Sequence, residues 1–136
     1  MEETTIDDMF IALNPAAKQI AAAVKCDVLH PIFSEGYGNQ ISGKPTIAVT
    51  KDDAVKNARF LSDTLALTYC HSFGATDFKL VKRGEFTGIV GYHKDGTPLV
   101  CIIRGFFEVA IGENGTQKNG YVSIATVYSL RPKSSD

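Results

Sequence analysis

The stretch that decides the fold is residues 86–104, which read FTGIVGYHKDGTPLVCIIR. Within it, Asp95-Gly96 is the strongest short hairpin signal in the chain. We therefore expect a strand at 86–93 and a longer strand at 99–111, joined by this turn.

Working outward, one further strand is expected on each side of the hairpin. Phe78 and Leu80 alternate with Lys79, which is the period of a strand. Residues 112–120 contain two Asn-Gly pairs and predict a loop, after which residues 121–130 predict the last strand. The second half of the chain thus predicts an antiparallel meander of four strands.

The first half of the chain favours helices. Asn14-Pro15 predicts a helix start, because Asn caps helices and Pro is tolerated at the first helical position. The alanine-rich residues 16–25 continue this helix, and Pro31 should end or redirect it. Residues 34–45 are rich in glycine and predict a loop.

A second helix is expected over residues 52–70, after a short β-branched run at 46–49 that is typical of a strand. Thr50 would cap this helix, because Asp53 follows it at capping-box spacing. Its apolar face would hold Ala54, Ala58, Leu61 and Leu65.

Helices followed by a meander indicate an α+β fold class. The strands at 99–103 and 122–127 are apolar on both faces, so we expect the sheet to be covered on both sides. One cover would be the main helix at 52–70, with a curved antiparallel meander wrapped around it. The other would be the N-terminal helix or a second subunit, and we expect a homodimer built on the sheet face opposite the main helix.

The length and net charge of the chain indicate its domain organisation and the partners that it does not suit. The chain has 136 residues, of which 44% are hydrophobic, so we expect a single domain over 1–136 with a polar tail from about residue 132. The formal net charge of −1 gives no electrostatic case for a nucleic-acid partner.

Targeting signals and metal-ligand patterns are also missing from the sequence. No apolar run approaches the ~20 residues of a membrane span, and the acidic N-terminus does not resemble a signal peptide, so we expect a cytoplasmic protein. Cys26, Cys70 and Cys101 form no CxxC pair and are expected to be small buried hydrophobes. We expect neither a metal nor a cofactor.

Four segments carry a resemblance in the order of their elements. They are ISGKP at 41–45 before the main helix, GEFTGIV at 84–90, RGFFEV at 104–109 and GYVSIA at 120–125. This order resembles the NTF2-like, or SnoaL-like, family of cone-shaped α+β rolls. The closing strand of that family usually carries a Trp, which this chain lacks, and the family's acid and base residues have no match here, so the resemblance implies no catalytic residue.

Two other folds have a similar order of elements. Residues 121–132 resemble the last strand of a hotdog thioesterase, although the His-Gly-Gly entry to the helix of that fold is missing. Thr126-Val127-Tyr128 resembles the end of the last strand in small toxin ribonucleases of the barnase, colicin and RelE-like group.

His71 and Asp77 are the candidate catalytic residues. His71 follows the main helix, and Asp77 lies beyond a glycine turn, where it could orient a histidine that acts as general base. The structural alternative is that His71 stabilises the helix C-terminus. We expect His71 to be at least partly buried beside a pocket, and an exposed ring would favour binding over catalysis.

Arg104, Thr126 and Tyr128 are the candidate ligand-binding residues. Arg104 interrupts an apolar run, so it should either pair with a carboxylate, such as Glu108 on the same face, or contact an anionic or carbonyl ligand in a cavity. Thr126 and Tyr128 lie on one face of the last strand and would be its neighbours there.

Three classes of function stay open. The first is a small-molecule pocket protein, either a ligand binder or an isomerase- or dehydratase-type enzyme, with a few polar groups in an apolar cavity. The second is a protein–protein interaction module that docks through its sheet face, with Phe106, Phe107 and Tyr121 as anchors. The third is a small toxin-type ribonuclease, against which the lack of a strongly basic composition counts.

Overall fold

An antiparallel sheet with the strand order β1-β8-β7-β6-β5 forms the centre of the molecule. The structure is a computed structural model that describes residues 6–36, 38–39, 44–45, 47–48, 50–84, 86–113 and 116–133. The short strand β4 also pairs with β8, and β2 pairs with β3 in a separate ladder. The strands are β1 Cys26–Gly36, β2 Gly38–Asn39, β3 Lys44–Pro45, β4 Ile47–Ala48, β5 Asp77–Arg83, β6 Phe86–Tyr92, β7 Pro98–Glu113 and β8 Thr116–Pro132.

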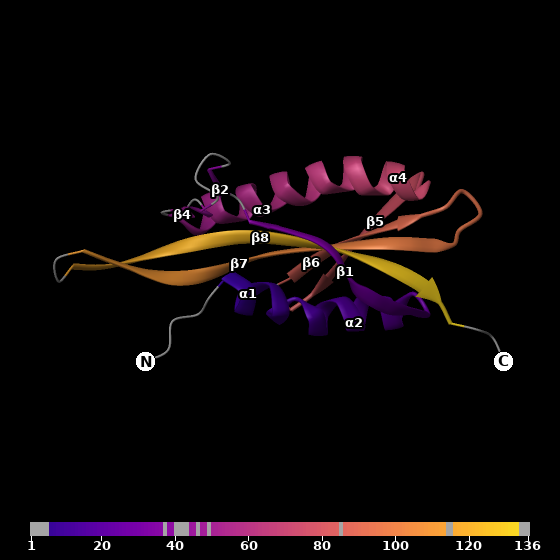
Figure 1. The fold of residues 1–136 in the computed structure, drawn as a ribbon, viewed down its shortest axis with the longest axis horizontal. Coiled ribbons are helices and arrows are strands. Elements are labelled where there is room, and N and C mark those ends of the chain that lie inside the picture. Colours follow the sequence, from indigo (N-terminus) through magenta and orange to yellow (C-terminus); the bar gives the residue numbers. More distant parts are fainter. Residues whose placement is uncertain are drawn as a thin grey trace.

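Helices cover both faces of this sheet, as Figure 1 shows. α1 (Ile6–Ala12) and α2 (Asn14–Ala23) lie on one face. On the other face lies α3 (Lys51–Leu65), which continues through a π-helical turn, η1 (Ala66–Cys70), into the short α4 (His71–Phe73). The predicted α+β class, with N-terminal helices, an antiparallel meander and a second helix packed on the sheet, is confirmed.

The sheet separates two hydrophobic cores. Because side chains alternate across a strand, β7 and β8 each supply apolar residues to both faces, which explains why neither strand shows a polar stripe. The core under α1 and α2 contains Met9, Leu13, Ala16, Ala17, Ile20, Ala21, Cys26, Val90, Cys101, Ile103, Val122, Ile124, Tyr128 and Leu130. The core under α3 contains Leu61, Leu65, Ile89, Val100, Ile102, Ala125 and Val127.

The sheet face on which a homodimer was expected is occupied by the chain's own helices. Leu13, Ala17 and Ile20 are fully buried against it. The apolar surface that was the reason for expecting a subunit there is thus not exposed, and that reason is wrong.

The main helix begins as predicted. The backbone N–H of Asp53 donates to the Thr50 hydroxyl at 3.2 Å, which is the expected cap. The predicted apolar face is buried at all four of its positions, Ala54, Ala58, Leu61 and Leu65. The predicted hairpin is also confirmed, because Gly96 has a φ of 90° and the His93 N–H donates to the Thr97 carbonyl at 2.8 Å.

Strand β1 was not predicted. It contains Pro31, which was expected to end or redirect a helix, and the register with β8 shifts on both sides of that residue. Proline has no backbone N–H to donate to a neighbouring strand, so it is tolerated only in an edge strand or at a break in the pairing register. The loop predicted at 34–45 therefore begins too early, and residues 37 and 40–43 of it lie outside the described residues.

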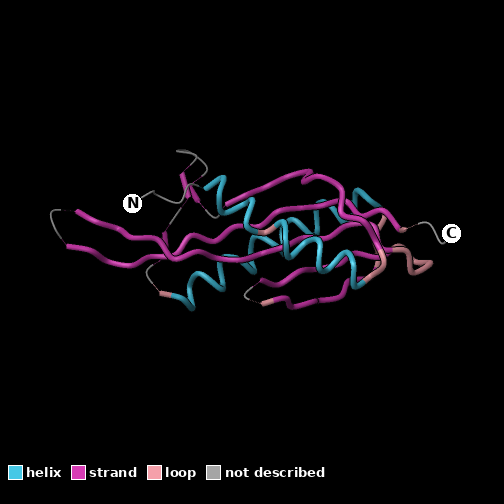
Figure 2. Tube along the Cα trace, turned by 90° about the horizontal axis from the view of Figure 1, so that it is seen from below, coloured by secondary structure: helices cyan, strands magenta, loops and turns pink. Residues whose placement is uncertain are grey.

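The loop predicted at 112–120 is also too long. β7 runs to Glu113 and β8 starts at Thr116, so the two strands form a long hairpin. Figures 1 and 2 show its arms extending beyond both helical layers. Residues 114–115 at the turn, and residues 134–136 of the predicted tail, lie outside the described residues.

Candidate functional site

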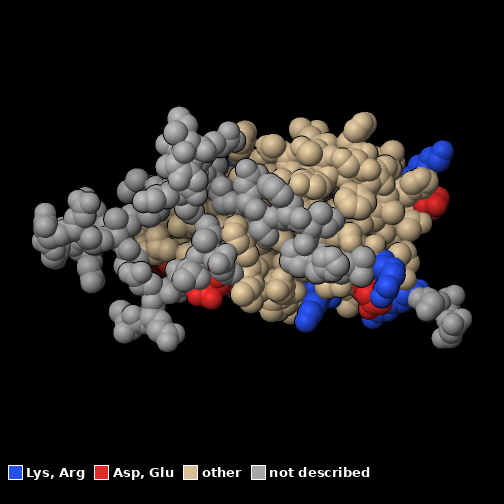
Figure 3. Space-filling view, viewed as in Figure 1, with Lys and Arg blue, Asp and Glu red and all other residues tan. Residues whose placement is uncertain are grey.

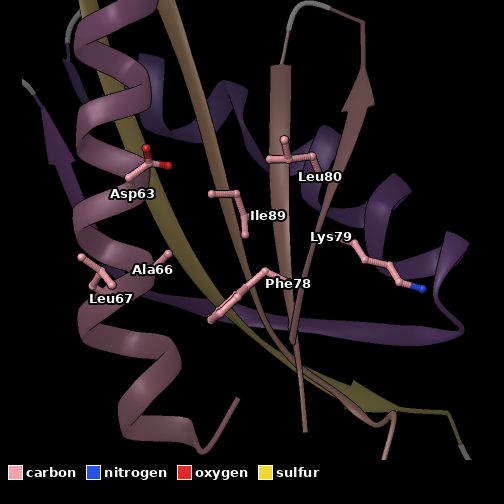
Figure 4. A pocket seen from close by; sticks show the side chains of 7 residues that line it. All are labelled: Asp63, Ala66, Leu67, Phe78, Lys79, Leu80 and Ile89. Atoms are coloured by element: carbon pink, nitrogen blue, oxygen red, sulfur yellow. The ribbon is translucent and has the colours of Figure 1, made fainter. Parts of the chain in front are cut away.

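A groove lies on the α3 face of the sheet, between that helix and β5. α3 packs mainly over β7 and β8, which leaves β5 uncovered on this side. The groove has a volume of about 380 Å³. It is lined by Asp63, Ala66 and Leu67 from the helical side, Phe78, Lys79 and Leu80 from β5, and Ile89 from β6 (Figure 4).

The walls of the groove are apolar and unusually open to solvent. Leu67 is 79% exposed, Phe78 is 50% exposed and Leu80 is 67% exposed. Phe78 and Leu80 alternate with Lys79, so both apolar side chains point toward the α3 face, and Figure 4 shows Lys79 pointing away from the groove. The Lys79 ammonium lies 5.3 Å from the centre of the Tyr92 ring, so its charge is held away from the groove.

The helical wall changes geometry where it meets the groove. Ala66 and Leu67 begin the π-helical turn η1, a rare element that is often found at functional sites. Hydroxyls from Thr64, Thr68 and Ser72 each donate to the carbonyl four residues earlier, at 2.8, 3.2 and 2.9 Å. Such bonds compete with the regular backbone ladder and accompany the departure from α-helical geometry.

A small charged cluster borders the groove at Asp63. The Asp63 carboxylate lies 3.8 Å from the Arg59 Nε and 3.9 Å from an Nη of Arg104. That same nitrogen of Arg104 donates to the buried Ser62 hydroxyl at 2.9 Å. Burial lowers the pKa of the Arg104 guanidinium, and the Asp63 carboxylate acts in the opposite direction.

Arg104 does pair with a carboxylate, although not with the one expected from the sequence. Its side chain, 18% exposed, lies against α3, with Ser62 and Asp63 as partners in place of Glu108. Arg104 is adjacent to the groove through Asp63 but is not among the residues that line it.

Tyr128 and Thr126 lie on the opposite face of the sheet, so the expected grouping with Arg104 is wrong. Arg104 is paired with Ala125 across the ladder, and Tyr128 faces the core under α1 and α2. The Tyr128 hydroxyl donates to the Asn14 side-chain oxygen at 2.7 Å, so Asn14 holds a tyrosine and does not cap its helix. Burial raises the pKa of the Tyr128 phenol, and its hydrogen bond with Thr126 acts in the opposite direction.

His71 and Asp77 are both exposed, so the predicted partial burial of His71 is wrong. His71 starts α4, beyond the π-helical turn, and Asp77 starts β5 after the turn at Gly74. Among the residues that the structure describes, no hydrogen bond or ion pair joins these two side chains. The pair therefore lacks the geometry of an oriented general base.

The aromatic residues expected as docking anchors are divided between the two faces. Phe106 contacts Tyr121 edge-on at 5.9 Å on the α3 side, whereas Phe107 packs against Phe86 at 6.0 Å on the α2 side. All four are at least partly buried by these contacts. They do not form one exposed surface.

The remaining expectations concern cysteines, metals and membranes. Cys26 and Cys101 are buried, as predicted, whereas the Cys70 side chain lies outside the described part. Within the described ranges, no three His, Cys, Asp or Glu residues are grouped so that they could hold a metal ion. None of the helices described has the length and apolar character that a membrane crossing requires.

The groove was missed at the sequence level although part of its signal was visible. The alternation of Phe78, Lys79 and Leu80 predicts a strand correctly, but not that this strand is at the sheet edge and uncovered by α3. Comparison with known proteins finds no family model that matches the chain, no similar curated protein and no similar solved structure.

Proposed function

We propose that the protein binds an apolar small molecule in the groove between α3 and β5. The observation that carries this proposal is the apolar cavity of about 380 Å³ walled by Leu67, Phe78 and Leu80. Its size is within the ~300–1,000 Å³ of typical ligand sites. Side chains of this kind are normally buried, and a ligand would remove them from water.

The polar end of the groove indicates the chemistry of the ligand's end group. Asp63 is the one carboxylate in the lining, and its charge is shared with Arg59 and Arg104. A neutral hydroxyl or amide can donate to such a carboxylate without breaking either arginine contact. The ligand that suits the site is therefore an apolar chain or ring system with one neutral hydrogen-bonding end.

Binding is proposed in preference to catalysis because the polar candidates do not converge on the groove. His71 is exposed, and Tyr128 lies on the face opposite Arg104. A ribonuclease would need these groups together on a basic surface. Figure 3 shows no broad patch of Lys and Arg on the described surface that it presents.

Titration with the uncharged fluorescent dye Nile red tests the proposal. Leu67→Glu places a charge in the groove wall while keeping a strong helix former, and it should weaken dye binding at least tenfold. The matched control is Ile11→Glu on α1, because Ile11 is 62% exposed and lies outside the groove. Equal binding by the two variants, or no saturable binding by the unmodified protein, would contradict the proposal.

A further inference from the structure

β5 is an edge strand whose outer side carries no partner among the described strands. It pairs with β6 on one side, in an unbroken register from Asp77↔Tyr92 to Arg83↔Phe86. The other side of such a strand presents backbone N–H and C=O groups that can pair with another chain.

The two edges of the sheet differ in how well they are protected. At the β1 edge, Pro31 and two register shifts interrupt the ladder, which are common devices against pairing. β5 has neither a proline nor a bulge. β5 carries three cations, Lys79, Lys82 and Arg83, and the first of them lies over the Tyr92 ring and not across the edge.

We propose that β5 pairs antiparallel with β5 of a second copy of this chain, with the two Leu80 residues facing each other on the two-fold axis. The charges on the strand support this register. Centring the pair on Leu80 brings Asp77 opposite Arg83 of the second copy, and the two-fold axis repeats that contact. Directly opposed charges of opposite sign stabilise a cross-strand pair.

The apolar side chains of the strand support the same register. Phe78 and Leu80, which are 50% and 67% exposed, project from the same face of β5 toward the groove. In the dimer, Leu80 meets its own copy, and Phe78 lies opposite Lys82, whose alkyl stem can cover the ring while its ammonium stays in water.

The dimer would place the two grooves side by side. A two-fold axis normal to the sheet makes the sheet continuous and keeps both α3 helices on one face. The β5 side of each groove then adjoins the β5 side of the other. The proposal does not depend on the identity, or even the existence, of a small-molecule ligand.

Disulfide cross-linking tests the predicted register directly. Directly opposed residues in an antiparallel pair have Cα atoms ~4.5–5.5 Å apart, which suits a disulfide. Leu80→Cys, made together with Cys70→Ser, should therefore oxidise to a covalent dimer of twice the 14.7 kDa chain. Ile11→Cys in the same background is the control and should stay uncrosslinked, since Ile11 is 62% exposed, close to the 67% of Leu80, but lies on α1.

A charge exchange tests the same register without a covalent bond. Asp77→Arg and Arg83→Asp should each raise the dimer dissociation constant roughly tenfold or more, because each creates two like-charge pairs. The double exchange should restore it. Sedimentation of a 14.7 kDa monomer at concentrations up to ~100 µM would overturn the proposal, and so would equal cross-linking of the two cysteine variants.

Discussion

The guanidinium of Arg104 in β7 donates a hydrogen bond of 2.9 Å to the hydroxyl of Ser62 in α3. The Ser62 hydroxyl in turn donates to the Arg59 carbonyl at 3.0 Å. This short chain of hydrogen bonds joins the middle of the sheet to the helix that walls the groove. It attaches α3 to the sheet beside Asp63, whose carboxylate lies 3.9 Å from the same nitrogen of Arg104.

Replacing Arg104 by alanine should lower the free energy of unfolding by about 2–3 kcal/mol, because a hydrogen bond from a charged donor and the packing of a mostly buried side chain are lost together. Urea denaturation measures the change. Arg59→Ala is the matched control, since Arg59 is 73% exposed and its ion pair with Asp63 should contribute less than ~1 kcal/mol. Equal losses in the two variants would contradict a structural role for the Arg104–Ser62 bond.

Replacing Tyr128 by phenylalanine should lower the free energy of unfolding by about 1–3 kcal/mol, because the change removes a partly buried hydrogen bond and leaves the Asn14 oxygen without its donor. A double-mutant cycle with Asn14→Ala isolates the pair. If the bond is formed, the cost of the double variant should be clearly less than the sum of the two single costs. Strict additivity would argue against it.

The free energy of unfolding should fall at alkaline pH because of Tyr128. Burial raises the pKa of Tyr128, so the folded phenol keeps its proton at a pH where the unfolded phenol, with a pKa of ~10, has lost it. The contribution of the protonated Tyr128 phenol to stability is complete below the pKa that this phenol has in the unfolded chain. It is lost as the pH rises toward the higher pKa of the folded protein. Unfolding free energies measured from pH 8 to 11 should fall less in Tyr128→Phe, and parallel curves would refute this.

Replacing Gly105 by alanine should destabilise the protein by about 1–3 kcal/mol. A Cβ at this position would lie 2.5 and 2.8 Å from two carbons of the Phe86 ring, which is itself packed against Phe107. Phe86→Leu replaces the ring that the new Cβ would meet with a smaller side chain. Combined with Gly105→Ala, it should recover part of the lost free energy of unfolding. Thermal melts of the two single variants and the double variant check this, and a worse-than-additive result would show that the contact is not the cause.

The elements that the sequence predicted well have a local physical cause. Thr50 caps its helix through a residue three positions away, and Gly96 supplies the positive φ of its turn. β1 was missed because its cause is distant: it is held by pairing with β8, which overrides the breaking tendency of Pro31. The resemblance to NTF2-like rolls stays a prediction.

The candidate site was harder to predict than the fold, for a related reason. That Arg104 needs a polar partner could be read from its apolar surroundings, but the choice between Asp63 and Glu108 depends on how α3 crosses the sheet. The sequence indicates that Tyr128 is a buried phenol. It does not indicate that Tyr128 lies on the sheet face opposite Arg104. Side-chain grouping across a sheet requires the strand order, which no local pattern encodes.

The adjacency of β1 and β8 also has a consequence for synthesis. The ladder pairs Cys26 with Pro132, so β1 cannot join the sheet until β8 has been synthesised. A ribosome must release residues 116–132 before β1 has a neighbour, and contacts between such distant residues form slowly. We expect the nascent chain to hold its helices over an unfinished sheet until residues 116–132 have left the ribosome, and apolar surface of that sheet is exposed during this interval.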